Sequence, residues 1–210
     1  VTAGGTTKAL AKNELLTVDV TLTPGPSYST PYWLRDPHPT GLFAPPAPET
    51  GIAPVGAPDL AVDFTVELGG VALNVSRPVR YQWVDPVNGE RFRTVEVLPP
   101  VTVTPTAPVR MFPDAAARPI EVKVRAHGGA RKGVAKLVVP AGWRVSPAER
   151  NFDLAVDGET TVAFSVTPNK SEPVEITAEA IIGTQSITLS EAVIDYLHVP
   201  RTTILAPATV

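Results

Sequence analysis

The chain has 210 residues, a formal net charge of −3 and no cysteine. The lack of cysteine excludes disulfides, thiolate metal sites and cysteine nucleophiles, and the slightly acidic balance favours neither nucleic acid nor an anionic membrane as a partner. No apolar run approaches the roughly 20 residues that a membrane-spanning helix requires, so we expect no membrane span.

The chain contains 24 Pro and 15 Gly, which excludes long helices because each proline lacks an amide donor and clashes with the preceding turn. The prolines lie between apolar runs, and this arrangement indicates short strands joined by turns. Because the chain starts at Val1 and not at Met, we expect a cut before this residue, made by processing or by design.

The first half of the chain shows the period-two alternation of strands with one buried face. It is clearest in DLAVDFTVEL at residues 59–68, where each even-numbered residue is large and apolar. Gly69-Gly70 and Asn88-Gly89 tolerate positive φ and predict hairpin turns. Further strands are expected in residues 14–24, 71–79, 79–83 and 91–105.

The second half repeats the pattern after residues 105–119, a stretch with four prolines and no alternation that we interpret as a linker. Asp157-Gly158 lies between two alternating runs and predicts another hairpin. Turn signals recur about every ten residues, as in a β-sandwich. Strands are expected in residues 119–127, 133–143, 151–168, 172–182 and 185–199.

These patterns predict an all-β chain of two tandem antiparallel β-sandwich domains of the immunoglobulin-like type, residues 1–107 and 108–210. The first domain includes a Pro-rich loop at residues 35–59, which is longer than most loops. Its apolar residues, among them Leu42 and Phe43, lead us to expect an ordered loop packed against the first sandwich.

The sequence offers few candidates for catalysis. Its three histidines, His38, His127 and His198, are far apart, and none has the spacing of a metal-binding pair. A G-x-S-x-G nucleophile elbow and a Gly-rich phosphate loop do not occur in the sequence. We therefore predict no catalytic, metal-binding or cofactor-binding residue, and no cofactor.

The segment TPYWLRDPHPTGLF, residues 30–43, is the candidate contact site because it places aromatic, basic and histidine side chains among three prolines. Three interpretations stay open: a plug that closes the core, a shelf that binds a sugar, and a contact between domains. The candidate ligand or domain contacts are Tyr32, Trp33, Arg35 and His38.

Proline also predicts the conformation of this segment. Pro31 and Pro37 restrict the residues before them to extended conformations, and adjacent side chains in an extended segment point to opposite sides. We therefore expect Trp33 to enter the core and Tyr32 to reach the surface or the second domain. The core is also the expected place of the two other tryptophans, Trp83 and Trp143.

Several stretches look like the region that follows the catalytic domain in large exported PIG-L/LmbE-type deacetylases, which use zinc and resemble N-acetylglucosaminyl deacetylases. These are PYWL at residues 31–34, residues 59–103, GVAKLVVPAGWRVSP at 133–147 and DYLHVPRTTILAP at 195–207. The second half also resembles the NEW3-type sandwich found beside glycosidase domains, through VVPAGW, FDL and TTVAFSVTP. The resemblance covers about residues 28–207.

The metal-binding segment of those deacetylases, of the type A-H-P-D-D, has no counterpart in this sequence, so no catalytic or zinc-binding residue carries over. The resemblance implies a non-catalytic accessory region of a secreted sugar deacetylase, extracellular or periplasmic, with further strands of its first domain before Val1. The implied partners are the catalytic domain of the same parent chain and a glycan. An adhesin or surface-layer module without an enzyme partner, and a hydrolase with unrecognised residues, stay open as alternatives.

Overall fold

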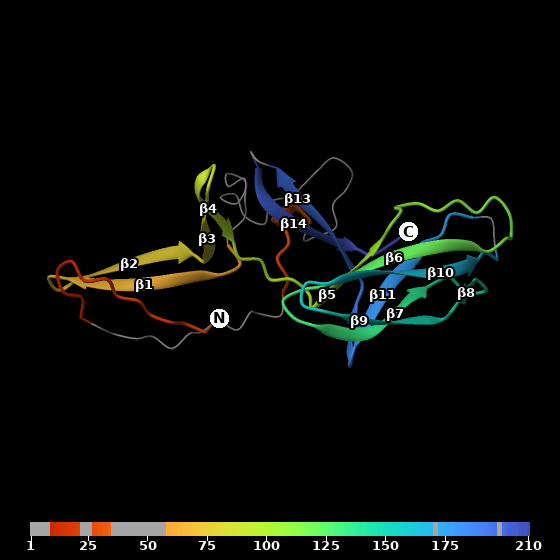
Figure 1. Ribbon diagram of the computed structural model, residues 1–210, viewed down its shortest axis with the longest axis horizontal. Helices are drawn as coiled ribbons and strands as arrows, with labels where there is room; N and C mark the ends of the chain where they lie inside the picture. Colours follow the sequence, from red (N-terminus) through yellow and green to blue (C-terminus); the bar gives the residue numbers. More distant parts are fainter. Residues whose placement is uncertain (1–8, 22–26, 35–57, 170–171, 197–198) are drawn as a thin grey trace. The chain divides into compact units, whose positions relative to one another are not determined.

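The computed structural model describes residues 9–21, 27–34, 58–169, 172–196 and 199–210. These residues form antiparallel strands, a 3-10 turn at Tyr32–Leu34 and no α-helix (Figure 1). The prediction of an almost all-β chain with antiparallel sheets is therefore confirmed. Most of the Pro-rich loop lies outside the described residues, so its packing stays a prediction.

The chain divides into two compact units. Unit 1 comprises residues 1–28 and 47–97, and unit 2 comprises residues 29–46 and 98–210. The candidate aromatic residues Tyr32 and Trp33 therefore belong to unit 2.

The stretch expected to be a linker lies inside unit 2. Strand β5 (Val101–Pro105) pairs with β6 (Arg118–Ala126), so residues 106–117 connect two neighbouring strands of one sheet. The linker interpretation is wrong, because the loss of alternation marks a long connection between paired strands and not a break between domains. The boundary expected at residues 107/108 falls within this connection.

Unit 1 contains two hairpins. β1 (Ala61–Leu68) pairs with β2 (Val71–Pro78), and β3 (Arg80–Asp85) pairs with β4 (Gly89–Thr94). The turn between β1 and β2 needs glycine, because Gly69 has a φ of 60°, where a side chain would strain the backbone. Both turns agree with the prediction from their glycine-containing dipeptides.

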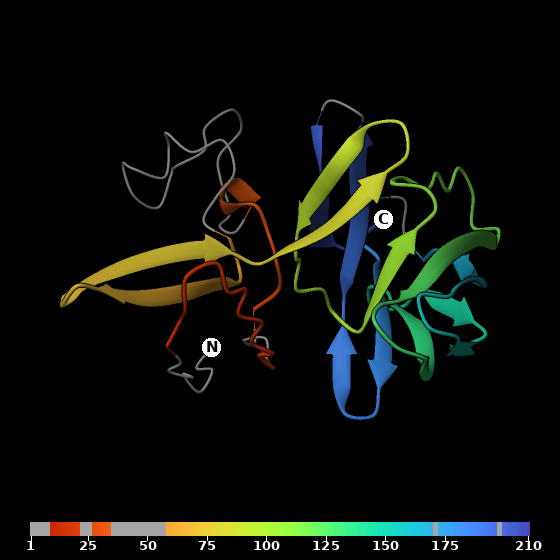
Figure 2. The ribbon, with the colours of Figure 1, turned by 60° about the vertical axis from the view of Figure 1, so that its left-hand side comes forward.

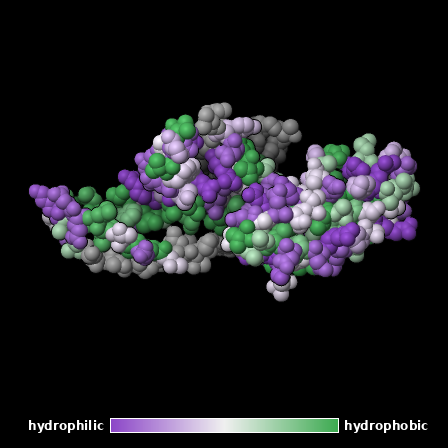
Figure 3. All heavy atoms as spheres, viewed as in Figure 1, coloured by the Kyte–Doolittle hydropathy of each residue, from purple (hydrophilic) through white to green (hydrophobic). Residues whose placement is uncertain are grey.

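One face of the β1–β2 hairpin is apolar and open to solvent, and Figure 3 shows hydrophobic residues along it. The register places Phe64 opposite Val75 and Val66 opposite Leu73, and residues paired in this way share a face. At least half of each of these side chains except Val75 is exposed. We call this set the apolar hairpin face: Phe64, Val66, Leu68, Val71, Leu73 and Val75.

Residues 14–21 do not form the strand that their alternation predicts. Leu15, Val18 and Val20 are exposed, at 91%, 45% and 44%, and no sheet of the described residues includes them. Alternation shows which side chains a strand would bury, but a strand also needs a neighbour to take its backbone hydrogen bonds. The prediction is wrong for this stretch because no neighbour is supplied.

Unit 2 contains two four-stranded antiparallel sheets and a further hairpin (Figure 2). The first sheet has the order β5-β6-β10-β8, and the second has the order β12-β11-β7-β9. β13 (Leu189–Tyr196) and β14 (Val199–Pro207) form the hairpin. The remaining strands are β7 (Arg131–Val138), β8 (Arg144–Ser146), β9 (Glu149–Leu154), β10 (Glu159–Thr167), β11 (Thr177–Ile182) and β12 (Gln185–Ile187).

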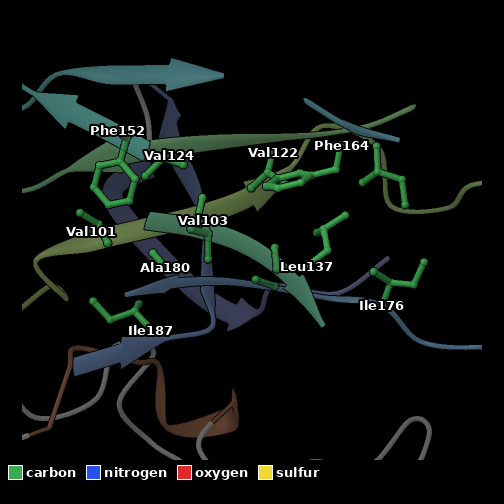
Figure 4. Packing of buried hydrophobic residues seen from close by; sticks show 14 of the residues in the cluster. Val101, Val103, Val122, Val124, Leu137, Phe152, Phe164, Ile176, Ala180 and Ile187 are labelled. Carbon is green, nitrogen blue, oxygen red and sulfur yellow. The ribbon is translucent and has the colours of Figure 1, made fainter. Parts of the chain in front are cut away.

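Both sheets of unit 2 contribute side chains to one hydrophobic core (Figure 4). Val101 and Phe164 come from the first sheet, Phe152 and Ala180 come from the second, and each is at most 5% exposed. Burial of a side chain such as Phe164 stabilises the fold by about 1.5–3 kcal/mol. Trp143 is 9% exposed in the same core, which confirms its predicted burial.

The turn at Asp157-Gly158 joins two strands, as predicted, but these strands do not form a hairpin. β9 pairs with β7, whereas β10 pairs with β6 and β8, so the turn carries the chain from one sheet to the other. The carboxylate of Asp157 accepts a hydrogen bond from the amide of Gly128 (2.9 Å). The dipeptide therefore identified a turn correctly, but it contains no information about which strands pair.

Candidate functional site

The two candidate aromatic residues lie in the 3-10 turn Tyr32–Leu34, which is closed by a hydrogen bond from the amide of Leu34 to the carbonyl of Pro31 (2.9 Å). The ring centroids of Tyr32 and Trp33 lie 5.0 Å apart in an edge-to-face arrangement. The predicted extended conformation is wrong here. Pro31 restricts the residue before it to extended conformations, but its own fixed φ is compatible with a turn, and its carbonyl accepts the hydrogen bond that closes this turn.

Tyr32 and Trp33 are both partly buried. The expected difference between them, with Trp33 in the core and Tyr32 at the surface, is therefore not observed. Arg35 and His38 lie outside the described residues, and their predicted contacts stay predictions.

A charged cluster fastens the β13–β14 hairpin to the first sheet of unit 2. The side chain of Glu191 is 5% exposed, and its carboxylate lies 3.2 Å from Arg125 Nη1 and 3.1 Å from His127 Nε2. Thr102 Oγ1 lies 3.2 Å from the same His127 nitrogen, and the amide of Glu191 donates to Thr104 Oγ1 (3.2 Å). The cluster therefore takes residues from β5, β6 and β13.

The environment of Glu191 lowers its pKa. Burial alone raises the pKa of this carboxyl group, but the hydrogen bond and positive charge of His127, followed by those of Arg125, outweigh the effect of burial. A carboxylate that is held ionised between two donors is typical of an ion cluster that stabilises the fold. Sequence reasoning missed the cluster because its residues are distant along the chain and share no motif.

The β3–β4 hairpin of unit 1 presents an aromatic and cationic face. The register pairs Tyr81 with Arg93 and Trp83 with Arg91, so the four side chains share one face. The rings of Tyr81 and Trp83 are stacked, with centroids 5.6 Å apart and planes 25° apart, and Arg93 Cζ lies 5.4 Å from the Tyr81 centroid. We call these four residues the aromatic–arginine face.

The predicted burial of Trp83 in a core is wrong. Tyr81 is 56% exposed, and Trp83 is partly exposed and lies outside the hydrophobic core. The pattern Tyr-x-Trp followed by Arg-x-Arg was a usable signal, since each pair lies on one side of its strand. Only the register of the turn, however, shows that the two pairs face the same side.

Among the described residues, no group of three or more His, Cys, Asp or Glu side chains could hold a metal ion. In the same parts of the chain, no helix is long and apolar enough to cross a membrane. A shallow depression of unit 2 contains the exposed ion pair of Lys132 with Asp153 (2.7 Å). Such an exposed pair is typical of the solvent-facing side of a strand.

No protein-family model matches the chain, and no curated protein matches its sequence. The proposal of a function therefore rests on the geometry of the chain's own residues and on the resemblance stated from its sequence.

Proposed function

We propose that the chain is a non-catalytic accessory region of a secreted PIG-L-type N-acetyl-sugar deacetylase. It acts as a structural module that contacts the catalytic domain of the same parent chain and a carbohydrate. The resemblance of residues 28–207 to the region after the catalytic domain motivates the identity of the parent protein. The apolar hairpin face is the observation that carries the contact with a partner domain.

The apolar hairpin face is poorly suited to water. Hairpins of two strands are only marginally stable alone and usually need a third strand or a packing layer over their apolar side. Leu68 and Val71, next to the turn, are 71% and 60% exposed, and contiguous exposed apolar patches larger than a few hundred Å² mark interaction sites. On the polar side of the hairpin, Thr65 donates a hydrogen bond to Asn74 (2.9 Å), and polar side chains there can also bind water. The apolar side has no such partners in water, so we infer that a second protein layer covers it.

We further propose that both units belong to immunoglobulin-like sandwiches. In unit 2, two antiparallel sheets share one core, which is the arrangement of such a sandwich. In unit 1, two hairpins with an open apolar face would form one layer, and the catalytic domain or strands of the parent chain would supply the other. The extracellular or periplasmic location follows from the proposed parent enzyme.

The experiment compares the 210-residue chain with the complete parent protein. Zinc content and the release of acetate from N-acetylglucosamine oligosaccharides are measured for both. We expect acetate release and bound zinc in the parent protein only. Turnover by the 210-residue chain alone, or a parent protein whose other regions consist of further β-domains without a metal site, would exclude the proposal. The second result would instead favour the adhesin or surface-layer alternative.

A further inference from the structure

We propose that the aromatic–arginine face of the β3–β4 hairpin binds a sugar chain that carries carboxylate groups, such as an oligosaccharide of uronic acids. This inference deepens the proposed function, since it rests on the carbohydrate contact and gives that contact a chemistry and a set of residues. It also places the contact on β3 and β4, and not in the segment of residues 30–43.

Tyr81 and Trp83 supply the apolar part of the site. They are two residues apart on β3 and therefore project from the same side of the strand. Their rings are stacked on each other, with centroids 5.6 Å apart and planes 25° apart, so they form one aromatic unit, and a sugar would pack against its outer surface. The face of an aromatic ring is electron-rich, so it attracts the polarised C–H groups on the flat side of a pyranose. Tyr81 is more than half exposed, and Arg93 Cζ lies 5.4 Å from its ring centroid, so the sugar would reach this aromatic unit beside the guanidinium.

Arg91 and Arg93 supply the charged part. Each lies directly opposite one of the rings, and a guanidinium group can bind a carboxylate through two parallel hydrogen bonds. Within the described residues, no salt bridge joins either arginine to a carboxylate. Asp85, at the end of this face, is engaged by the turn: its carboxylate accepts hydrogen bonds from the amides of Val87 (2.9 Å) and Asn88 (2.7 Å).

The other face of the same hairpin has a different charge. Arg80 lies over the ring of Phe92, with its Cζ 4.5 Å from the centroid, and Gln82 donates a hydrogen bond to Glu90. This face carries one guanidinium and one carboxylate, whereas the aromatic–arginine face carries two guanidiniums and the single carboxylate of Asp85. The excess positive charge therefore lies on the side that also has the stacked rings.

The number of charges favours an acidic sugar over a nucleic acid. Proteins that bind a polyphosphate backbone follow it with long basic tracks, since the affinity grows with each phosphate that is neutralised. Two arginines beside one pair of stacked rings instead fit a sugar chain with a few carboxylates. The chain as a whole has a net charge of −3, which disfavours a densely charged polymer.

The experiment is isothermal titration of the whole 210-residue chain with tetragalacturonate, and with cellotetraose as the neutral probe. We expect binding of tetragalacturonate and much weaker binding of cellotetraose. Trp83→Ala should weaken binding about tenfold, because it removes one of the two aromatic rings against which the sugar packs. Arg93→Gln should weaken it by about tenfold or more, because it removes the charge-assisted hydrogen bonds to the carboxylate.

Arg80→Gln is the matched control, because it removes the same charge from the other face of the same hairpin. Its affinity should equal that of the unmodified chain. Arg93→Lys keeps the charge but not the bidentate geometry, and it should bind with intermediate affinity. Circular dichroism of every variant separates loss of binding from loss of folding, and Trp83→Phe keeps an aromatic ring if Trp83→Ala does not fold.

Failure to bind tetragalacturonate would overturn the proposal, as would equal binding of both sugars or equal losses in Arg93→Gln and Arg80→Gln. Tighter binding of a single-stranded oligonucleotide would also overturn it and would assign the face to nucleic acid. The proposed function is tested independently of this proposal. Acetate release from a soluble neutral oligosaccharide by the parent protein requires no residue of this face, so a parent without deacetylase activity is distinguishable from a hairpin without affinity.

Discussion

Glu191 Oε2 and His127 Nε2 lie 3.1 Å apart, and this contact joins β13 to the residue that follows β6. Arg125 approaches the other oxygen of the same carboxylate at 3.2 Å. With its side chain 5% exposed, Glu191 would be costly to bury without these partners. The hairpin of β13 and β14 is therefore tied to the first sheet by an ion cluster in addition to its apolar contacts.

Glu191→Gln keeps the shape of the side chain but removes its charge. We expect the free energy of unfolding at pH 7 to fall by about 1.5–3 kcal/mol, the contribution typical of hydrogen bonds to a charged group. Asp195→Asn is the control, because Asp195 is exposed on the same strand, and it should change the free energy by less than about 0.5 kcal/mol. Urea denaturation measures both. Equal effects of the two substitutions would show that the cluster adds nothing.

The contribution of Glu191 should also depend on pH. Its pKa is lowered in the folded chain, mainly because His127 and Arg125 outweigh burial, so the folded state favours the ionised form. The stabilisation is fully present above the ordinary carboxyl pKa of about 4.3, and it is lost as the pH falls through the lowered folded value.

Denaturation of the unmodified chain and of Glu191→Gln across pH 7 to 3 tests this dependence. The difference between their free energies of unfolding should shrink at the acidic end. Lowered carboxyl pKa values elsewhere, as at Asp85 and Asp114, are shared by both proteins and cancel in the difference. A difference that stays constant with pH would contradict the ionised state of Glu191.

Local sequence patterns predicted most of the strands and turns, though not the state of residues 14–21, because period-two alternation and glycine dipeptides act within a few residues. They could not predict which strands pair. Asp157-Gly158 is a turn in both the prediction and the structure, yet β9 and β10 lie in different sheets. The same limit explains why the interpretation of residues 105–119 as a linker is wrong, since the pairing of β5 with β6 is not encoded in the connection between them.

The site residues show a related limit. Trp83 is in phase with Tyr81, and phase alone cannot tell a face that is covered from one that is open. Whether a strand face is covered depends on the other elements that pack against it. Among the described residues of unit 1, Leu60 is the only buried hydrophobic residue. The cluster of Glu191 with His127 was invisible for another reason: it depends on a long-range pairing that brings β13 to β5 and β6.

Gly133 should not tolerate alanine. A Cβ at this position would overlap the carbonyl oxygen of Ile181 and lie 2.7 Å from Phe152 Cζ. Since a backbone carbonyl and a buried ring cannot move aside freely, we expect Gly133→Ala to cost about 1–3 kcal/mol. Gly129→Ala is the control, because its Cβ would meet only the flexible end of Arg131. Thermal denaturation should separate the two variants, and an unchanged Gly133→Ala would contradict the close packing of β7 against β11.

Tyr32 and Trp33 should be energetically coupled. Both are partly buried, and their rings meet edge to face with centroids 5.0 Å apart, so each single alanine variant loses the same contact. A double-mutant cycle measured by urea denaturation should give a coupling of about 0.5–1.5 kcal/mol, as for other aromatic pairs. A large loss for Trp33→Ala with none for Tyr32→Ala, and no coupling, would restore the interpretation in which only the tryptophan enters the core.

Leu73→Lys tests whether the apolar hairpin face is covered in the parent protein. Leu73 is 50% exposed in this chain, so the substitution should change the free energy of unfolding of the isolated 210-residue chain by less than about 0.5 kcal/mol. In the parent protein the same lysine would enter a closed apolar contact, where an unpaired charge is costly, and the melting temperature should fall.

Ala72→Lys is the matched control, because the preceding residue on β2 lies on the polar side of the hairpin, opposite Glu67. It should leave the melting temperature of both proteins unchanged. If Leu73→Lys destabilises the isolated chain as much as the parent protein, residues of this chain cover the face by themselves. If it destabilises neither, the face is not the contact, and the second layer proposed for unit 1 must be sought elsewhere.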